Sequence, residues 1–274
     1  MKYGFVVPNN FGVEDPLALI TLAVEAERLG FDSVWVNHHV LNLGYVGERL
    51  GERPYWDALV TLTWIASATQ HIALGTSVLV MPYLHPMVLA KELATLDCLS
   101  AGRLVVGLGV GSLPEENAAL GVPYENRGRY SDEFIEVMRL LWATGRASYH
   151  GEHFSFDDIV ASPKPQQNPH PPIMVGGNRP PALRRVGRYA DGWHPMGLPP
   201  DSVRKRLPII REAAAAADRP MISQIQVRTE MHRIDENSVA DYAATGVTEL
   251  VMHISTADME ETLQQMRQFA GRMF

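Results

Sequence analysis

Short apolar runs alternate with longer amphipathic segments along the whole chain. The apolar runs predict strands at residues 3–7, 33–36, 72–80, 104–108, 173–175, 192–194, 223–228 and 249–254. The amphipathic segments predict helices at residues 16–29, 56–69, 86–99, 131–143, 181–189, 201–217, 236–245 and 258–271. Because the strands are apolar without alternation, both faces of their sheet should be buried, as in parallel sheets. Eight such units in 274 residues predict one α/β domain over residues 1–274, a (β/α)8 barrel, with an open doubly wound sheet as the alternative.

Helix-end signals support these boundaries. Pro16 suits a first helical turn and Gly30 suits the position just past a helix end. Ser131 is the predicted N-cap of the fourth helix. The segment 145–171, between helix four and strand five, departs from the alternation of strands and helices. It contains a predicted hairpin at 149–156, and we interpret it as a lid or rim of the barrel.

Composition and charge argue against several classes of protein. The formal net charge of -7 gives no reason to expect a basic face for nucleic acid or anionic lipid. A single cysteine, Cys98, excludes a disulfide framework and fits a cytoplasmic enzyme, and its place late in a helix predicts burial. The sequence predicts neither a signal peptide nor a membrane span.

In barrels of this type, chemistry takes place at the carboxyl ends of the strands. That rule brings together polar and glycine residues that follow different strands. They are Asn9, Asn10, Asn37, His38, His39, Ser77, Val78, Gly109, Val110, Gly111, Ser112, Gly176, Gly177, Asn178, Arg179, His194, Met196 and His253. We expect these residues to line one mouth.

Two glycine-rich stretches are candidate ligand sites. Gly176-Gly177-Asn178-Arg179 precedes a helix, so backbone N–H groups, the helix dipole and a cation could hold a phosphate. The other interpretation is a tight turn that needs glycine. The run 107–111 lacks the third glycine of a dinucleotide fingerprint, so we interpret it either as close approach to a flat ring or as barrel packing.

The adjacent histidines His38 and His39 are the candidates for acid–base chemistry. Side chains of neighbouring residues on an extended segment point opposite ways, so at most one should face the mouth. Metal binding is not predicted, since His150 and His153 have no cysteine or acidic cluster beside them.

Three arginines near strand and helix ends have other expected roles. Arg103 precedes strand four, at the end of the barrel opposite the mouth, and we expect it to pair with Asp97. Arg127 and Arg129 could anchor a loop or bind a ligand phosphate.

Several motifs, taken together and in order, resemble the luciferase-like monooxygenase superfamily over nearly the whole chain. The resemblance rests on residues 75–79, 85–86, 90–97, 100–103, 107–111, Glu116, 120–123, 127–129, 163–165, 171–173, 176–177 and 190–193. It implies a barrel that binds FMN or the deazaflavin F420, and the motifs are most similar to the F420-dependent branch. The resemblance also implies a cis peptide at Ser77–Val78 beneath the ring of the cofactor, and a nearby histidine that handles a proton.

Two departures from the family pattern bear on the substrate and the cofactor. F420-dependent relatives commonly have an acidic residue where this chain has His38, and FMN-dependent relatives commonly have Glu-His-His where it has Asn37-His38-His39. Some sugar-phosphate dehydrogenases of the family have an acidic residue at the position of Ser112, so a sugar-phosphate substrate is not favoured.

Three functions follow as hypotheses. The first is an F420-dependent oxidoreductase that transfers hydride to or from a small apolar substrate. The second is an FMN-dependent monooxygenase that receives reduced flavin from a separate reductase. The third is a flavin-binding barrel without catalysis. Relatives are often homodimers through helices two and three, which Ala58, Leu59, Leu62 and Ile65 would allow, although these residues could equally face the barrel.

Overall fold

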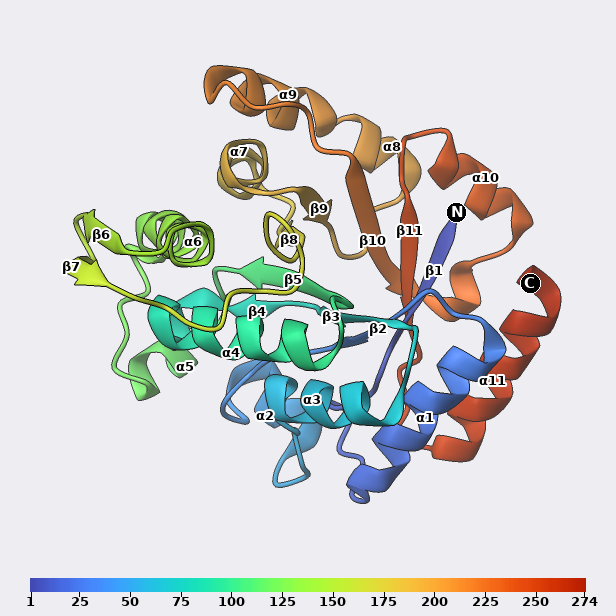
Figure 1. The fold of residues 1–274 in the computed structure, drawn as a ribbon. Coiled ribbons are helices and arrows are strands. Elements are labelled where there is room, and N and C mark those ends of the chain that lie inside the picture. The colour runs from blue at the N-terminus through green and yellow to red at the C-terminus, as the bar shows by residue number, and fades with distance from the viewer.

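The computed structural model describes residues 1–274, and its strands form a closed parallel barrel surrounded by helices (Figure 1). The strands are β1 (Lys2–Val6), β2 (Ser33–Val36), β3 (Ala73–Thr76), β4 (Leu79–Val80), β5 (Leu104–Gly109), β8 (Ile173–Gly176), β9 (Gly192–His194), β10 (Gln224–Glu230) and β11 (Glu249–His253). β3 and β4 share the third position, and both pair with β5, which closes the ring. The predicted (β/α)8 barrel is confirmed.

A helix follows each strand position and packs on the outside of the barrel (Figure 1). These helices are α1 (Pro16–Leu29), α3 (Ala58–Ala68), α4 (Pro86–Leu99), α6 (Arg127–Ala143), α7 (Pro180–Tyr189), α9 (Leu207–Ala216), α10 (Glu236–Ala243) and α11 (Met259–Met273). Their apolar faces and the strands share one large core that includes Phe5, Phe134 and Trp193, each fully buried. None of the helices combines the length and apolarity that a membrane crossing requires.

Several short elements lie outside the eight βα units. They are α2 (Gly44–Leu50), α5 (Pro114–Ala119), α8 (Pro200–Arg204), the 3-10 turns η1 (Met81–Tyr83) and η2 (Met231–Arg233), and the hairpin of β6 (Ala147–His150) and β7 (Ser155–Ile159). The predicted hairpin is confirmed, and it lies beside α6 at the edge of the molecule (Figure 1). Glu133 of α6 accepts hydrogen bonds from the backbone N–H groups of Glu152 and His153, which ties the hairpin turn to the helix.

Three predicted boundaries were wrong for identifiable reasons. α6 begins at Arg127, so Ser131 lies buried inside the helix and Asn126 takes the cap position. The helix expected at 201–217 is two helices, because Pro208 lacks the N–H that would continue α8. The third strand is interrupted at Ser77–Val78, where the peptide bond is cis as the resemblance implied.

The expected Arg103–Asp97 ion pair does not form. The Arg103 guanidinium donates instead to the carbonyls of Ala66 and Thr69, at the end of α3, where a helix leaves carbonyls without intrahelical partners. Asp97 accepts from the backbone N–H and the side-chain amide of Gln167, at 2.9 and 2.7 Å. The expected burial of Cys98 was also wrong, because its side chain is exposed on α4.

The helix α3 presents most of its named apolar residues to the barrel. Ala58, Leu62 and Ile65 are fully buried in the core, so they are not available to a partner subunit. The exposed apolar side chains of α3 are Val60 and Trp64. The homodimer itself stays a prediction.

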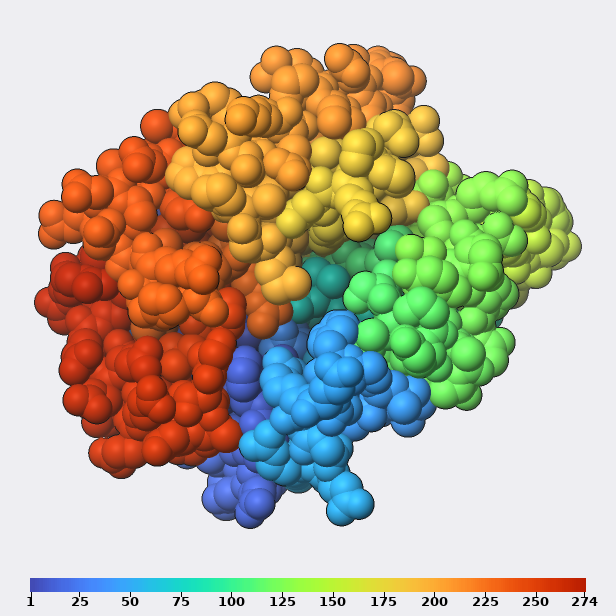
Figure 2. Space-filling view, turned by 180° about the vertical axis from the view of Figure 1, so that it is seen from behind, coloured from blue at the N-terminus to red at the C-terminus, as the bar shows by residue number.

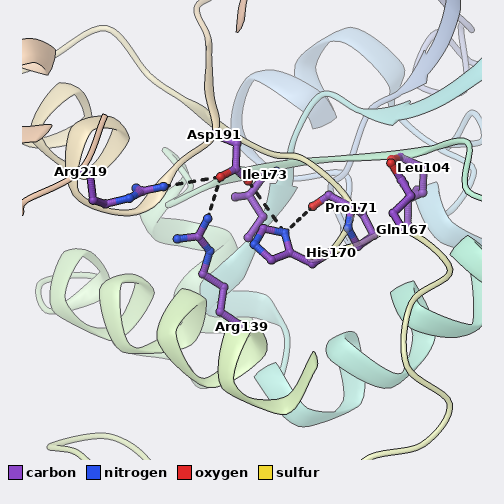
Figure 3. A network of polar contacts seen from close by, with 8 residues as sticks. All are labelled: Leu104, Arg139, Gln167, His170, Pro171, Ile173, Asp191 and Arg219. Atoms are coloured by element: carbon purple, nitrogen blue, oxygen red, sulfur yellow. Dashed lines mark hydrogen bonds and ion pairs between the residues drawn. The ribbon is translucent and has the colours of Figure 1, made fainter. Parts of the chain in front are cut away.

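Asp191, directly before β9, organises the end of the barrel opposite the mouth (Figure 3). One carboxylate oxygen accepts from the Arg139 guanidinium at 2.7 Å and from Arg219 at 3.5 Å. The other oxygen accepts from the backbone N–H of Ile173 at 2.9 Å, at the start of β8. The carboxylate therefore joins α6, β8 and the segment that leads into β10.

We expect Asp191→Asn to lower the free energy of unfolding by about 2 kcal/mol, since hydrogen bonds to charged groups contribute roughly 1.5–3 kcal/mol. Urea unfolding measures the change. The matched control is Asp201→Asn, whose pair with Arg204 is exposed on both sides, and its effect should stay below about 0.5 kcal/mol. Equal effects of the two substitutions would contradict an organising role for Asp191.

Candidate active site

The carboxyl ends of the strands surround a hollow, which we call the mouth. Figure 2 shows it near the middle of one face, where blue, green and yellow-to-orange segments meet over teal atoms. Four predicted residues lie at, or just after, the carboxyl end of a barrel strand. Three of them are partly exposed, namely Val78, Val110 and Gly176, and Met196 is largely exposed. The predicted site residues therefore come from strand ends on one side of the barrel.

His39 is hydrogen-bonded through both nitrogens of its ring. Its Nδ1 lies 2.6 Å from Oε2 of Glu116, a fully buried residue of α5. Its Nε2 lies 3.0 Å from the hydroxyl of Tyr45, on α2. The other oxygen of Glu116 accepts from the backbone N–H groups of Val40 and Leu41, at 2.6 and 3.1 Å. One carboxylate thus fixes both the imidazole and the loop that carries it.

The bonds to Glu116 keep it an anion. Burial on its own would raise the pKa of Glu116, but hydrogen bonds from His39, Val40 and Leu41 lower the pKa overall. A carboxylate beside Nδ1 favours the tautomer with the proton on Nδ1, which leaves Nε2 with a lone pair. In this tautomer the lone pair of Nε2 faces the hydroxyl of Tyr45, and the Glu116 carboxylate lies beside Nδ1.

His38 faces the opposite way, as the alternation of an extended segment predicts. Its Nδ1 accepts the backbone N–H of Val80 at 3.1 Å. Burial lowers the pKa of His38 to about 4, so this imidazole is neutral near pH 7. The Nδ1 of His38 is therefore engaged with β4, whereas the Nδ1 of His39 is paired with a carboxylate.

Asn37 belongs to a cluster of buried amides beneath the mouth. Its backbone N–H and side-chain amide both donate to Oδ1 of Asn9, and the amide also donates to Oδ1 of Asn10. Its own Oδ1 accepts from the guanidinium of Arg228, on β10. The side-chain amide of Asn37 is thus fully hydrogen-bonded to other residues of the protein.

The interruption of the third strand brings Ser77 to the centre of the same network. Its hydroxyl lies 2.9 Å from Nε2 of His194, at the end of β9, and its hydroxyl and carbonyl each accept from Arg228 at 3.1 Å. His194 stacks on Trp35 with ring centroids 4.9 Å apart. Burial, with a smaller effect from Arg228, lowers the pKa of His194 to about 3. His194 is therefore a neutral member of this network.

The glycine at the end of β5 makes room for a side chain of the interrupted strand, whereas Gly176 of β8 leaves an ordinary van der Waals distance. A Cβ at Gly109 would lie 2.6 Å from Val78, and one at Gly176 would lie 3.4 Å from it. A Cβ at Gly111 would lie 2.9 Å from Val80. Of the two interpretations of the run 107–111, barrel packing is the one with contacts to support it.

The turn at 176–179 is weaker as an anion site than the sequence suggested. Gly177 has a φ of 109°, which explains the glycine. Pro180 and Pro181 occupy the first helical positions, and proline lacks the N–H that would face an anion. Asn178 donates to the carbonyl of Met196 at 2.9 Å and so fastens the neighbouring loop, while Arg179 is exposed.

The arginines at the start of α6 anchor the surrounding loops. Arg127 lies over the ring of Tyr124 and donates to its carbonyl, and Arg129 pairs with Glu152 on the hairpin. Glu133, Glu152 and His153 bring three potential metal ligands within 4.8 Å of one another. The carboxylate of Glu133 is already occupied by the hairpin backbone, so this group is better explained as an anchor.

Two residues central to the site were not singled out from the sequence. Glu116 was noted only as part of a family motif, because its partner lies 77 positions away. Arg228 lies within a strand in which Gln226, Arg228 and Glu230 alternate with other residues. Polar residues at every second position of an otherwise buried strand indicate an inward-facing polar side, and that signal could have located Arg228.

Comparison with known proteins now adds to this geometry. The sequence profile of the luciferase-like monooxygenase family matches residues 1–270. The chain belongs to this family. The resemblance inferred from the motifs is confirmed, and with it the expectation of an oxidoreductase of this family.

Relatives within the family differ in their cofactor. The chain is 35% identical over 214 residues to an F420-dependent glucose-6-phosphate dehydrogenase of Kineococcus radiotolerans, which covers 74% of this chain and 60% of the relative. It is 31% identical over 199 residues to an FMNH(2)-dependent dimethylsulfone monooxygenase of Pseudomonas putida, which covers 71% of this chain and 53% of the relative. The match thus spans less than two thirds of each of these relatives.

Solved structures support the fold over the full length. An F420-dependent secondary alcohol dehydrogenase superimposes with a TM-score of 0.82 at 17% identity, covering 99% of this chain and 98% of the other. A monooxygenase from Streptomyces bottropensis gives 0.81 at 22% identity, covering 100% and 98%. These likenesses establish the family barrel rather than a particular reaction.

We predict that Glu116→Gln changes the tautomer of His39. With the carboxylate in place, Nδ1 should carry the proton, whereas a neutral amide can donate to Nδ1 as well as accept from it. ¹⁵N chemical shifts of labelled histidine report the tautomer directly. Glu115→Gln, one residue away and exposed, is the matched control and should leave the His39 signals unchanged. The same spectrum for Glu116→Gln and the parent protein would contradict the assigned hydrogen bond.

Acid should destabilise the protein through its buried histidines. His194 and His38 have pKa values of about 3 and about 4 in the folded protein against an ordinary value of 6.5, so only the unfolded chain takes up their protons between these limits. The free energy of unfolding should then fall from about pH 6.5 downward, by roughly 1.4 kcal/mol per pH unit for each histidine. Urea titrations at several pH values measure this slope. His194→Gln should reduce the slope, and the exposed control His150→Gln should not; equal slopes would refute this explanation.

Proposed function

We propose that this protein is an F420-dependent oxidoreductase that transfers hydride to or from a small, apolar organic substrate. The observation that carries the proposal is the His39–Glu116 pair, in which a buried carboxylate fixes an imidazole that follows the second strand. Relatives named as F420-dependent dehydrogenases, at up to 36% identity, support the choice of cofactor. An acid–base pair with this geometry also argues against a barrel that only stores a flavin.

The residues of the mouth fit a flat, partly polar ring system. Buried polar atoms without a partner are found at four neighbouring strand ends, namely Oδ1 of Asn178, Nδ1 of His194, Nε of Arg228 and Nδ1 of His253. Buried polar groups are normally hydrogen-bonded, so these four atoms, which belong to a longer set spread over the molecule, are candidates for contact with a ligand. Val78, Val110 and Met196 would supply the apolar contacts and Gly176 and Gly177 the close backbone approach. A bound deazaflavin would supply a ring that accepts or gives hydride.

His39 would handle the proton that accompanies the hydride. When a substrate alcohol is oxidised, its hydroxyl proton would pass to Nε2 of His39, and Glu116 would stabilise the imidazolium. In the reverse direction, the same nitrogen would return the proton to a carbonyl oxygen. The surroundings of this atom are aromatic, since the rings of Tyr45 and Tyr55 lie 5.8 and 5.9 Å from that of His39. Such a wall favours an apolar substrate, and Ser112 in place of an acid does not favour a sugar phosphate.

A second candidate function is an FMN-dependent monooxygenase that takes reduced flavin from a separate reductase. The adjacent pair His38-His39 favours it, together with the similarity to the dimethylsulfone monooxygenase. The role of His39 in proton transfer would be similar in both reactions. The cofactor therefore distinguishes the two functions.

Parallel fluorescence titrations with F420 and FMN test the proposal. We expect F420 to bind at least tenfold more tightly, because the motif order is most similar to that of the F420-dependent branch. Tight binding of FMN with indifference to F420 would overturn the proposal in favour of the monooxygenase, and oxygen uptake with reduced FMN would then be measured.

The role of His39 is tested with F420-loaded protein and a panel of small secondary alcohols. His39→Asn should lower kcat by about 10²–10⁴, the usual contribution of general acid–base catalysis, and leave the Kd for F420 unchanged. His150→Asn, on the exposed hairpin, is the matched control and should retain full activity. A His39→Asn protein as active as this control would remove the histidine from the mechanism.

A further inference from the structure

The floor of the mouth contains a buried cation that no carboxylate balances. Arg228 is 7% exposed, and its Nη1 donates only to neutral acceptors, the carbonyl and hydroxyl of Ser77 and the amide oxygen of Asn37. Its Nε is buried and has no partner. None of the ion pairs of the protein includes Arg228. The guanidinium thus retains both a net charge and a free donor.

The groups around Arg228 do not supply the missing anion. The side chains with an electrostatic influence on it are the phenols of Tyr55 and Tyr45 and a second cation, Arg49. The nearby imidazoles of His194 and His253 are neutral, with pKa values lowered to about 3 and about 4 by burial and, to a smaller extent, by Arg228 itself. Burial lowers the pKa of Arg228 to about 10, which still leaves it protonated near pH 7.

The other buried arginine of this chain is balanced by a carboxylate. Arg185 is 6% exposed, much like Arg228, but its Nε pairs with the carboxylate of Asp132 and its Nη2 donates to the carbonyl of Gly128. An unpaired buried charge is strongly unfavourable, so proteins normally provide a counter-charge. The exception at Arg228 lies in the mouth, where a ligand can provide it.

The surroundings hold the guanidinium in place before any ligand arrives. Its backbone N–H donates to the carbonyl of Pro195 at 2.8 Å, and its carbonyl accepts from Gly197 at 2.9 Å, so β10 is fixed to the loop after β9. Asn37, its acceptor, is itself fixed by Asn9 and Asn10. A preorganised, water-poor cation stabilises a developing negative charge far more than one in solvent.

We propose that Arg228 is the anion-binding residue of the mouth, and that its planar guanidinium holds a delocalised negative charge of the ligand. This inference rests on the proposed function and deepens it. A hydride brings one negative charge to the group that accepts it, so such a charge arises in this site during turnover. Two sources share this chemistry: the reduced ring of the cofactor and a carboxylate or enolate oxygen of the substrate. A planar guanidinium that can donate hydrogen bonds from Nε and Nη suits either source of negative charge.

The first experiment compares oxidised and reduced cofactor. The Kd values of F420 and of FMN are measured in both oxidation states, under anaerobic conditions, for the parent protein, Arg228→Gln and Arg228→Lys. If the charge belongs to the cofactor, Arg228→Gln should weaken the reduced form at least tenfold more than the oxidised form. That ratio corresponds to a midpoint potential about 30 mV lower for a two-electron couple. Arg228→Lys, which keeps the charge, should show a smaller change.

The second experiment addresses the substrate as the source. Benzoate and its neutral analogue benzamide are titrated into cofactor-loaded protein by calorimetry. If the charge belongs to the substrate, Arg228→Gln should weaken benzoate at least tenfold and leave benzamide unchanged, with the ratio of oxidised to reduced cofactor affinity unaltered. Arg204→Gln, an exposed residue of α8, is the control in both experiments.

A purely structural role makes a different prediction. Removal of an unpaired buried cation should leave the urea midpoint of the ligand-free protein unchanged or higher, whereas loss of a structural residue should lower it and weaken all ligands in parallel. A lowered midpoint with parallel weakening in both Arg228→Gln and Arg228→Lys would overturn the proposal, as would unchanged binding in both experiments. If the parent protein bound neither F420 nor FMN, the proposed function would fail first, and the same benzoate and benzamide titrations into cofactor-free protein would still test Arg228.

Discussion

The barrel closes around an interrupted third strand, and the arrangement of the mouth depends on that interruption. β3 ends at Thr76 and β4 begins at Leu79, so Ser77 and Val78 leave the regular ladder. The interrupted strand then occupies space that is open only because residues 107 and 109 are glycines, since a Cβ there would overlap the carbonyl oxygen of Thr76 or lie 2.6 Å from Val78. A side chain larger than hydrogen at either position would collide with the interrupted strand or force it to move, so the glycines of β5 follow from one packing constraint.

Because of the same interruption, the carbonyl and the hydroxyl of the buried Ser77 bond to residues of distant strands. Ser77 contacts His194 from the sixth strand position and Arg228 from the seventh, and Arg228 in turn contacts Asn37 from the second. Such a network resists the small displacements that reduce catalysis, because every member is held by at least one other. His39 lies outside it and is held separately by Glu116, so the group that moves protons is positioned independently of the floor of the mouth.

The sequence was a good guide to features set by local pattern and a poor guide to those set by tertiary partners. The eight βα units, the hairpin and the opposite orientations of His38 and His39 all follow from periodicity, and each is present. The start of α6, the exposure of Cys98 and the partners of Asp97 and Arg103 depend on distant groups, and each expectation about them was wrong. The site shows the same division: His39 could be proposed from its place after a strand, but Glu116 becomes its partner only through the fold, and the cofactor-binding roles of the other mouth residues remain predictions.

Charged side chains have different partners at the two ends of the barrel. At the end opposite the mouth, Asp191 is met by two arginines, and the buried Glu249 accepts from Ser33 and from Gln226. At the mouth, atoms of His194, Arg228 and His253 are buried without partners. Unpartnered atoms also occur at the opposite end, on Arg139, Arg219 and Gln226, but each of these side chains also contacts a carboxylate. At the mouth, by contrast, the guanidinium of Arg228 has no carboxylate partner, so an anionic ligand would complete its contacts there.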